Sequence, residues 1–228
     1  MTSIRKTSLI AGVIYVITFA SIPTLTLYRA IHDPNYVMSD GPDSDVITGA
    51  ILEIIVAMGC VGTAVVLYPV LKKQNQAMAL GFVGSRIVEA GTIIVGVASL
   101  LTIVGLRQSG VGPEAVMTGR ALVMLYDKFF LVGQSLMPAV NDVLLGLLLY
   151  QSRLVPRSLS VIGIVGGPIL LSSDVGVLFG IIGQRDPLAM MSAIPVALFE
   201  ITLGILLIFN GFSDSNNILR NLISRQAQ

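Results

Sequence analysis

The segment AMALGFVGSRIVEAGTIIVGVASLLTIVGL, residues 77–106, decides which fold the sequence predicts. Its only charged residues are Arg86 and Glu89, and the remainder is apolar or small. A helix of about 20 predominantly apolar residues is long enough to cross the hydrocarbon core of a bilayer. Residues 77–106 therefore predict a transmembrane helix, and this helix carries two charged side chains into the membrane.

Five further stretches of the 228-residue chain are apolar over a similar length. Together the six predicted spans cover residues 7–28, 47–71, 77–106, 129–150, 158–182 and 188–212. We therefore predict an all-α fold, a polytopic membrane helix bundle with six transmembrane helices. The connections are too short to form a soluble domain, so residues 1–228 are expected to make a single integral membrane domain.

The composition excludes several classes of protein. Hydrophobic residues make up 54% of the chain and charged residues 12%, against roughly 25% charged residues in a soluble domain. The net charge is +1, from 14 basic and 13 acidic residues, so the chain has no basic field to bind nucleic acid. The single cysteine, Cys60, excludes an intramolecular disulfide and a thiolate metal cluster. The partner that remains is the lipid bilayer.

The distribution of lysine and arginine predicts the orientation, because cytoplasmic loops carry an excess of these residues. One side of the predicted bundle holds Arg5, Lys6, Lys72, Lys73, Arg153, Arg157, Arg220 and Arg225, and the other holds Arg29, Arg107, Arg120 and Arg185. Both termini are therefore expected in the cytoplasm, with the protein in the cell membrane. The first outer loop carries His32 and four acids, Asp33, Asp40, Asp43 and Asp45. With one histidine in the chain, a solvated acidic loop explains this pattern better than a metal site.

Ionisable residues at membrane depth are the most informative feature of the sequence. They are Glu53, Arg86, Glu89, Asp142 (next to Asn141), Asp174 and Glu200. The pair Asp127 and Lys128 is left out, because residues 129–150 already span the bilayer and the pair can reach the outer interface. Each buried charge costs about 3 kcal/mol, so six lone ions would cost roughly 15–20 kcal/mol. These groups must therefore be paired, protonated, hydrated or bound to a cation.

The charges inside the predicted membrane region do not balance, since five acids meet one arginine. Arg86 and Glu89 are three residues apart on one helix and can pair, and a guanidinium can hold a second carboxylate. Acidic residues such as Glu53 and Glu200 share a helix face with small residues, which places them at helix contacts. We hypothesise a polar cavity in which some carboxyl groups are protonated at neutral pH. The alternative is that these groups only form hydrogen bonds between helices.

Several stretches resemble the DUF4386 family of multi-pass membrane proteins. They are residues 5–15, residues 85–90 (SRIVEA), residues 154–157 leading to Gly163, the pair Ser173-Asp174, and the segment from Pro195 through Glu200 to Gly211. The resemblance places Arg86, Glu89, Asp174 and Glu200 on the characteristic positions of the family. Span four departs from the family pattern, with Tyr126-Asp127-Lys128 and Gln134 where other members often have His and Gly-Tyr elements. The resemblance implies the architecture and supplies no reaction.

Three functions stay open at this stage. The first is binding or transport of a proton, a cation or a small amphiphilic molecule. The second is a membrane enzyme that acts on a lipid or isoprenoid by general acid catalysis, and the third is a non-catalytic accessory or sensor protein. The predicted centre is Arg86 with Glu89, Asp174 and Glu200, supported by Glu53, Asn141 and Asp142. No metal site is predicted, and neither the cofactor nor the oligomeric state follows from the sequence.

Overall fold

The computed structural model describes residues 3–110 and 112–213, and over these residues it consists of helices without strands. Six helical stretches are long and apolar enough to cross a membrane. The predicted all-α fold with six transmembrane helices is therefore confirmed. The orientation of the termini stays a prediction, and two residues on which it rests, Arg220 and Arg225, lie outside the described residues.

The six spans differ in how continuous their helices are. The first contains α1 (Ser3–Thr18), the 3-10 turn η1 (Phe19–Ser21) and α2 (Thr24–Leu27), followed by the turns η2 (Ala30–His32) and η3 (Tyr36–Met38). The second and third are α3 (Ser44–Leu71) and α4 (Gln76–Gln108). The fourth runs through α5 (Ala115–Phe130), the π-helix η4 (Leu131–Leu136) and α6 (Met137–Ser152). The fifth is α7 (Arg157–Leu178), and the sixth combines α8 (Pro187–Ser192) with α9 (Ile194–Phe209).

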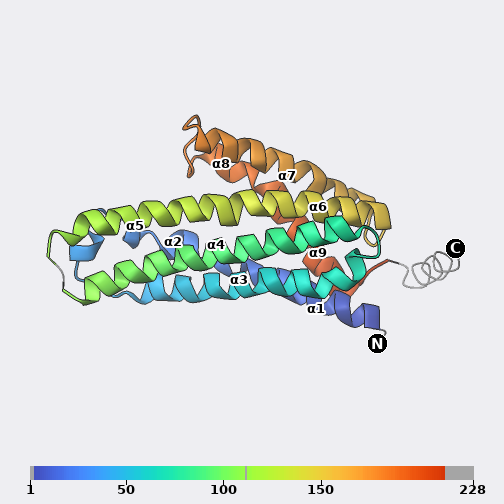
Figure 1. Ribbon diagram of the computed structural model, residues 1–228, viewed down its shortest axis with the longest axis horizontal. Coiled ribbons are helices and arrows are strands. Elements are labelled where there is room, and N and C mark those ends of the chain that lie inside the picture. The colour runs from blue at the N-terminus through green and yellow to red at the C-terminus, as the bar shows by residue number, and fades with distance from the viewer. Residues whose placement is uncertain (1–2, 111, 214–228) are drawn as a thin grey trace, which may run out of the picture.

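The helices run back and forth between the two ends of an elongated bundle (Figure 1). The start of α1, the end of α9 and the turns at residues 72–75 and 153–156 lie at one end, which we call the terminal end. The connections from α2 to α3, from α4 to α5 and from α7 to α8 lie at the opposite end, the loop end.

An apolar core holds the helices together near the terminal end. The most extensive helix pairs are α3 with α4, α6 with α7, and α1 with α9. They bury a common set of side chains that includes Leu67, Phe82, Leu145 and Phe199, each at most 1% exposed. Phe82 and Phe199 come within one helical turn of Arg86 and Glu200, so this core fixes the backbone beside the charged residues.

The fourth span begins earlier than predicted. The sequence predicts a start at residue 129, but the helix begins at Ala115. Its first part packs on α4 and η3 and buries Ala115, Gly119 and Tyr126. The segment at 115–128 is amphipathic and lacks a continuous apolar run. Hydropathy alone therefore does not predict that it belongs to the fourth span. Asp127 and Lys128 consequently lie within the helix instead of before it.

The first and last spans are held side by side by a close backbone approach and by Arg5. A Cβ atom added to Gly12 would lie 2.6 Å from the carbonyl oxygen of Gly204. Arg5 donates hydrogen bonds to the carbonyl oxygens of Leu207 (2.8 Å) and Ile208 (2.5 Å). Since the last carbonyls of a helix have no partner within that helix, Arg5 stabilises the end of α9.

At the loop end, Asp43 joins the segment before α3 to the end of α4. Its carboxylate accepts hydrogen bonds from Arg107 (2.9 Å), Gln108 (3.0 Å) and Tyr36 (2.8 Å). Burial by itself raises the pKa of Asp43. The hydrogen bonds from Gln108 and Tyr36 and the charge of Arg107 outweigh burial and hold this pKa below its usual value.

The lowered pKa of Asp43 predicts a pH-dependent contribution to stability. A carboxylate with a lower pKa in the folded protein stabilises it above the unfolded pKa of about 4, and the contribution is lost as the pH falls through the folded pKa. We expect Asp43→Asn to lower the melting temperature at about pH 7 and to have little effect near pH 2. Thermal unfolding in detergent measures both values, and an equal decrease at the two pH values would contradict the prediction.

The contact between α1 and α9 predicts that Gly12 tolerates no side chain. The Cβ atom of Gly12→Ala would push the two helices apart, and such overpacking typically costs about 1–3 kcal/mol. Gly91→Ala on α4 is the matched control, because nothing lies within 4 Å of a Cβ atom at Gly91. We expect a lower melting temperature for Gly12→Ala and an unchanged or higher one for Gly91→Ala. Equal effects of the two substitutions would show that the approach of α1 to α9 is not tight.

Candidate functional site

Arg86 on α4 is the centre of a buried ion-pair cluster. Its guanidinium donates to the carboxylate of Glu89 at 3.0 Å and to that of Glu200 on α9 at 2.5 Å. It also donates to the hydroxyl oxygen of Tyr15 on α1 at 3.2 Å. Arg86 is only 1% exposed, so these partners replace the water that would otherwise solvate its charge. The arrangement unites the first, third and sixth spans.

Neighbouring polar side chains fix the orientation of Glu89. The amide nitrogen of Asn141 on α6 donates to Glu89 Oε2 at 2.6 Å. The amide oxygen of Asn141 in turn accepts a hydrogen bond from the hydroxyl of Ser85. Glu89 therefore receives donors from Arg86 on its own helix and from the neighbouring helix α6. We call Tyr15, Arg86, Glu89, Asn141 and Glu200 the inner cluster.

Asp142 lies beside the inner cluster but is not bonded into it. It is fully buried, and neither carboxylate oxygen has a hydrogen-bond partner among the described residues. It follows Asn141, whose amide binds Glu89, so it lies at the level of the inner cluster. Because an ionised carboxylate without partners is very costly in such surroundings, we expect Asp142 to carry a proton.

Two other acids lie closer to the loop end. Glu53 Oε1 on α3 accepts hydrogen bonds from the hydroxyl of Tyr126 (2.7 Å) and the amide of Gln134 (3.0 Å). Asp174 Oδ1 on α7 accepts one from the hydroxyl of Ser135 (2.7 Å). The second oxygen of each carboxylate is buried and has no partner among the described residues. We call Glu53, Tyr126, Gln134, Ser135 and Asp174 the outer cluster.

The π-helix η4 supplies two of the three donors of the outer cluster. Gln134 and Ser135 follow each other in η4, yet they bond to acids on two different helices, α3 and α7. Single π-helical turns within α-helices are rare and occur frequently at functional sites. Gly133 permits the close packing of η4 on α4, because a Cβ atom there would collide with the side chain of Thr92.

The seven predicted site residues therefore separate into two levels along the bundle. Counted from the helix ends at the terminal end, Arg86, Glu89, Asn141, Asp142 and Glu200 are 9 to 13 residues deep. Asp174 and Glu53 are 17 and 18 residues deep. With a rise of about 1.5 Å per residue, the levels lie roughly 10 Å apart. The sequence places all seven in one band with Asp174 beside Arg86, whereas the structure joins Asp174 to Ser135.

Tyr15, Tyr126, Gln134 and Ser135 belong to the clusters but were not among the predicted site residues. All four are neutral, so a search for charges at membrane depth does not find them. Tyr126 and Gln134 did stand out as positions where span four departs from the family pattern. That departure is the feature of the sequence that indicates these two residues, since both donate hydrogen bonds to Glu53.

Two adjoining cavities lie between the helices, one beside each cluster. The outer cavity, of about 600 Å³, is lined by Gln134, Ser135 and Asp174 among others. The inner cavity, of about 240 Å³, reaches Arg86, Glu89 and Glu200. The residues that line both are Thr24, Leu25, Phe130, Gln134 and Ala193. Three predicted site residues line neither cavity and lie behind the cavity walls, namely Asn141, Asp142 and Glu53.

Charged side chains surround the mouth of the outer cavity. Asp127 on α5 contacts His32 Nε2 and Arg185 Nη2, each at 3.1 Å, and Arg185 also contacts His32. Gln184 donates to the carbonyl oxygen of Asp127 at 2.9 Å. These contacts join the η2 turn, α5 and the connection between α7 and α8. His32 thus contacts both Asp127 and Arg185 in a polar network, and within residues 3–110 and 112–213 no three His, Cys, Asp or Glu side chains are grouped to hold a metal ion.

The fold and the two clusters define a polytopic helical membrane protein with a polar interior. The family model described as a domain of unknown function, DUF4386, matches residues 10–211, which include every predicted site residue. The chain therefore belongs to the DUF4386 family, and the resemblance seen in the sequence is confirmed. No curated protein and no solved structure matches the chain.

Two substitutions at the level of the inner cluster are expected to differ in how much they destabilise the protein. Arg86→Gln leaves Glu89 and Glu200 buried without their cation, and removal of one partner of a buried pair typically costs about 3–5 kcal/mol. Asp142→Asn replaces a protonated carboxyl by a group of the same shape and should change stability by less than about 1 kcal/mol. Unfolding in detergent compares the two variants with the native protein. A large stabilisation by Asp142→Asn would show that Asp142 is ionised.

Proposed function

We propose that this protein binds a proton, a cation or a small amphiphilic molecule in its intramembrane cavities and carries it across the cell membrane. The observation that supports this function best is the pair of adjoining cavities. The inner cavity reaches the Arg86–Glu200 ion pair and shares wall residues with the outer cavity, and on this proposal the two together form a route to the loop end of the bundle. An ion pair that served only to hold helices together would not require such a route.

The charge balance at the inner cluster supports a ligand that is positively charged or that exchanges protons. Arg86 is shared between Glu89 and Glu200, which both line the inner cavity, so these three side chains carry one negative charge in excess. Any further cation or proton that reaches this level therefore meets carboxyl oxygens that can receive it. Ionisable residues inside membrane segments commonly mark ion pathways and proton relays.

The proposed orientation gives the route a direction. If both termini are cytoplasmic, as the distribution of lysine and arginine predicts, the outer cavity faces the outside of the cell. The apolar core of Leu67, Phe82 and Phe199 lies between the inner cluster and the terminal end. On this proposal the described conformation is open toward the outside and closed toward the cytoplasm, as one state of an alternating-access cycle would be.

Proton flux in proteoliposomes tests the proposal. We expect substrate-dependent proton movement between about pH 6 and 8 for at least one compound in a panel of alkali cations, alkylamines, betaines and short fatty acids. Glu200→Gln should lower this flux by about tenfold or more, because a charge-assisted contact with Arg86 is lost. The matched control is Glu114→Gln, at an exposed acid near the loop end that lines neither cavity.

Two results would contradict the proposed function. One is the absence of flux and binding for the whole panel with protein that remains folded in the vesicles. The other is an equal flux for the native protein and Glu200→Gln, since the inner cluster would then take no part in transport.

A further inference from the structure

The outer cavity has ionisable side chains of opposite sign at its two depths. At the mouth, Arg29 is exposed, and its guanidinium has no hydrogen-bond or ion-pair partner among the described residues. Arg185 also lines the mouth and shares its charge with Asp127. Deeper inside, Asp174 is 3% exposed, and its Oδ2 atom has no partner among the described residues. The mouth therefore carries an excess of positive charge and the interior an unsatisfied carboxylate.

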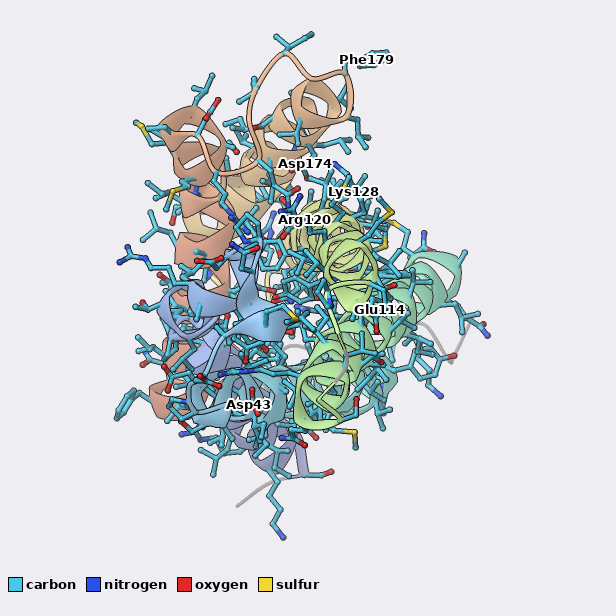
Figure 2. All side chains as sticks on the ribbon, turned by 90° about the vertical axis from the view of Figure 1, so that its left-hand side faces the viewer. Asp43, Glu114, Arg120, Lys128, Asp174 and Phe179 are labelled. Atoms are coloured by element: carbon cyan, nitrogen blue, oxygen red, sulfur yellow. The ribbon has the colours of Figure 1, made fainter. Side chains whose placement is uncertain are left out.

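Figure 2 looks onto the loop end and labels Asp174 on α7. Phe179, at the turn after α7, projects outward from the bundle, while Asp174 lies further in, toward the other helices (Figure 2). Asp174 is four residues before the end of α7 at Leu178, which corresponds to about 6 Å along the helix axis.

The wall of the outer cavity suits an organic cation with an apolar body. Three aromatic side chains line the outer cavity, namely Tyr28, Tyr126 and Phe130. Tyr28 and Tyr126 meet edge to face at 5.4 Å between ring centroids, and Phe130 follows at 6.3 Å from Tyr126. Ammonium groups bind favourably to aromatic faces, and quaternary ammonium ligands are recognised in this way. A cavity of about 600 Å³ is within the range of small-molecule sites.

We infer that the outer cavity binds a small zwitterionic amphiphile, with its ammonium group at Asp174 and its acidic group at Arg29 and Arg185. This inference rests on the proposed function and names the class of its ligand. A simple cation would satisfy Asp174 but would pass two guanidinium groups at the mouth. A simple anion would satisfy Arg29 but would leave Asp174 unpaired. A ligand with both charges satisfies both ends of the cavity.

A matched set of radiolabelled probes tests this inference by equilibrium dialysis against the protein in nanodiscs. The probes share a chain of six carbons, which in hexanoate includes the carboxylate carbon, and differ in charge: hexyldimethylglycine betaine, hexyltrimethylammonium, hexanoate and hexanol. Binding to empty nanodiscs is subtracted. We expect the betaine to bind about tenfold or more tightly than each singly charged probe, because it makes both charge-assisted contacts.

Two variants assign the two ends of the ligand, and a third serves as the control. Asp174→Asn should weaken the betaine and the ammonium probe about tenfold and leave hexanoate unchanged. Arg29→Gln should weaken the betaine and hexanoate and leave the ammonium probe unchanged. Arg29 is exposed and its guanidinium has no partner among the described residues, so this variant is expected to fold even if Asp174→Asn does not. The control is Arg120→Gln, at an exposed arginine of the same end that does not line the cavity and should alter no affinity.

The outcomes separate this inference from the proposed function. If the ammonium probe binds as tightly as the betaine and Arg29→Gln changes nothing, the zwitterionic ligand is wrong while the proposed function stands. If no probe binds, the inference is also wrong, and the proton-flux experiment with Glu200→Gln then decides independently about the proposed function.

Discussion

The need to neutralise Arg86 away from water governs the organisation of this protein. Its guanidinium is almost completely buried, and five N–H donors require acceptors there. Glu89 lies on the same helix, but Glu200 and Tyr15 come from the last and first spans. Three helices distant in sequence must therefore meet at one level. The close approach of α1 to α9, and the hydrogen bonds of Arg5 to the end of α9, hold two of these helices in that position.

The buried acids that are not paired with Arg86 have different surroundings at the two levels of the bundle. Near Arg86, Asp142 is shielded from both cavities and is compatible with a permanent proton. Nearer the loop end, Glu53 and Asp174 receive neutral donors from the π-helix η4, and one oxygen of each has no partner within residues 3–110 and 112–213. Of these three acids, only Asp174 faces a cavity. Position relative to the cavity wall, and not charge alone, distinguishes an acid that can meet a ligand from one that cannot.

The network at the mouth of the outer cavity joins residues that lie far apart in the sequence. In the sequence, His32 belongs to an acidic loop and Asp127 to a pair beside the bilayer interface. In the structure they contact each other and Arg185, although 95 residues separate the first two. The earlier start of α5 makes this contact possible, because it places Asp127 within a helix that reaches the loop end.

The sequence by itself determined the six spans, the all-α class and the set of charged residues inside the membrane region. These follow from hydropathy and from the cost of burying a charge, which depend on residue type and spacing alone. It also predicted the Arg86–Glu89 pair, since that contact lies within one helix. Only the tertiary structure decided that Glu200 completes the pair, that Asp174 bonds to Ser135 instead, and that Asp142 has no partner. The reason is that packing between spans sets the rotation of each helix about its axis and the π-helical turn at η4. The sequence of a single span does not encode this packing.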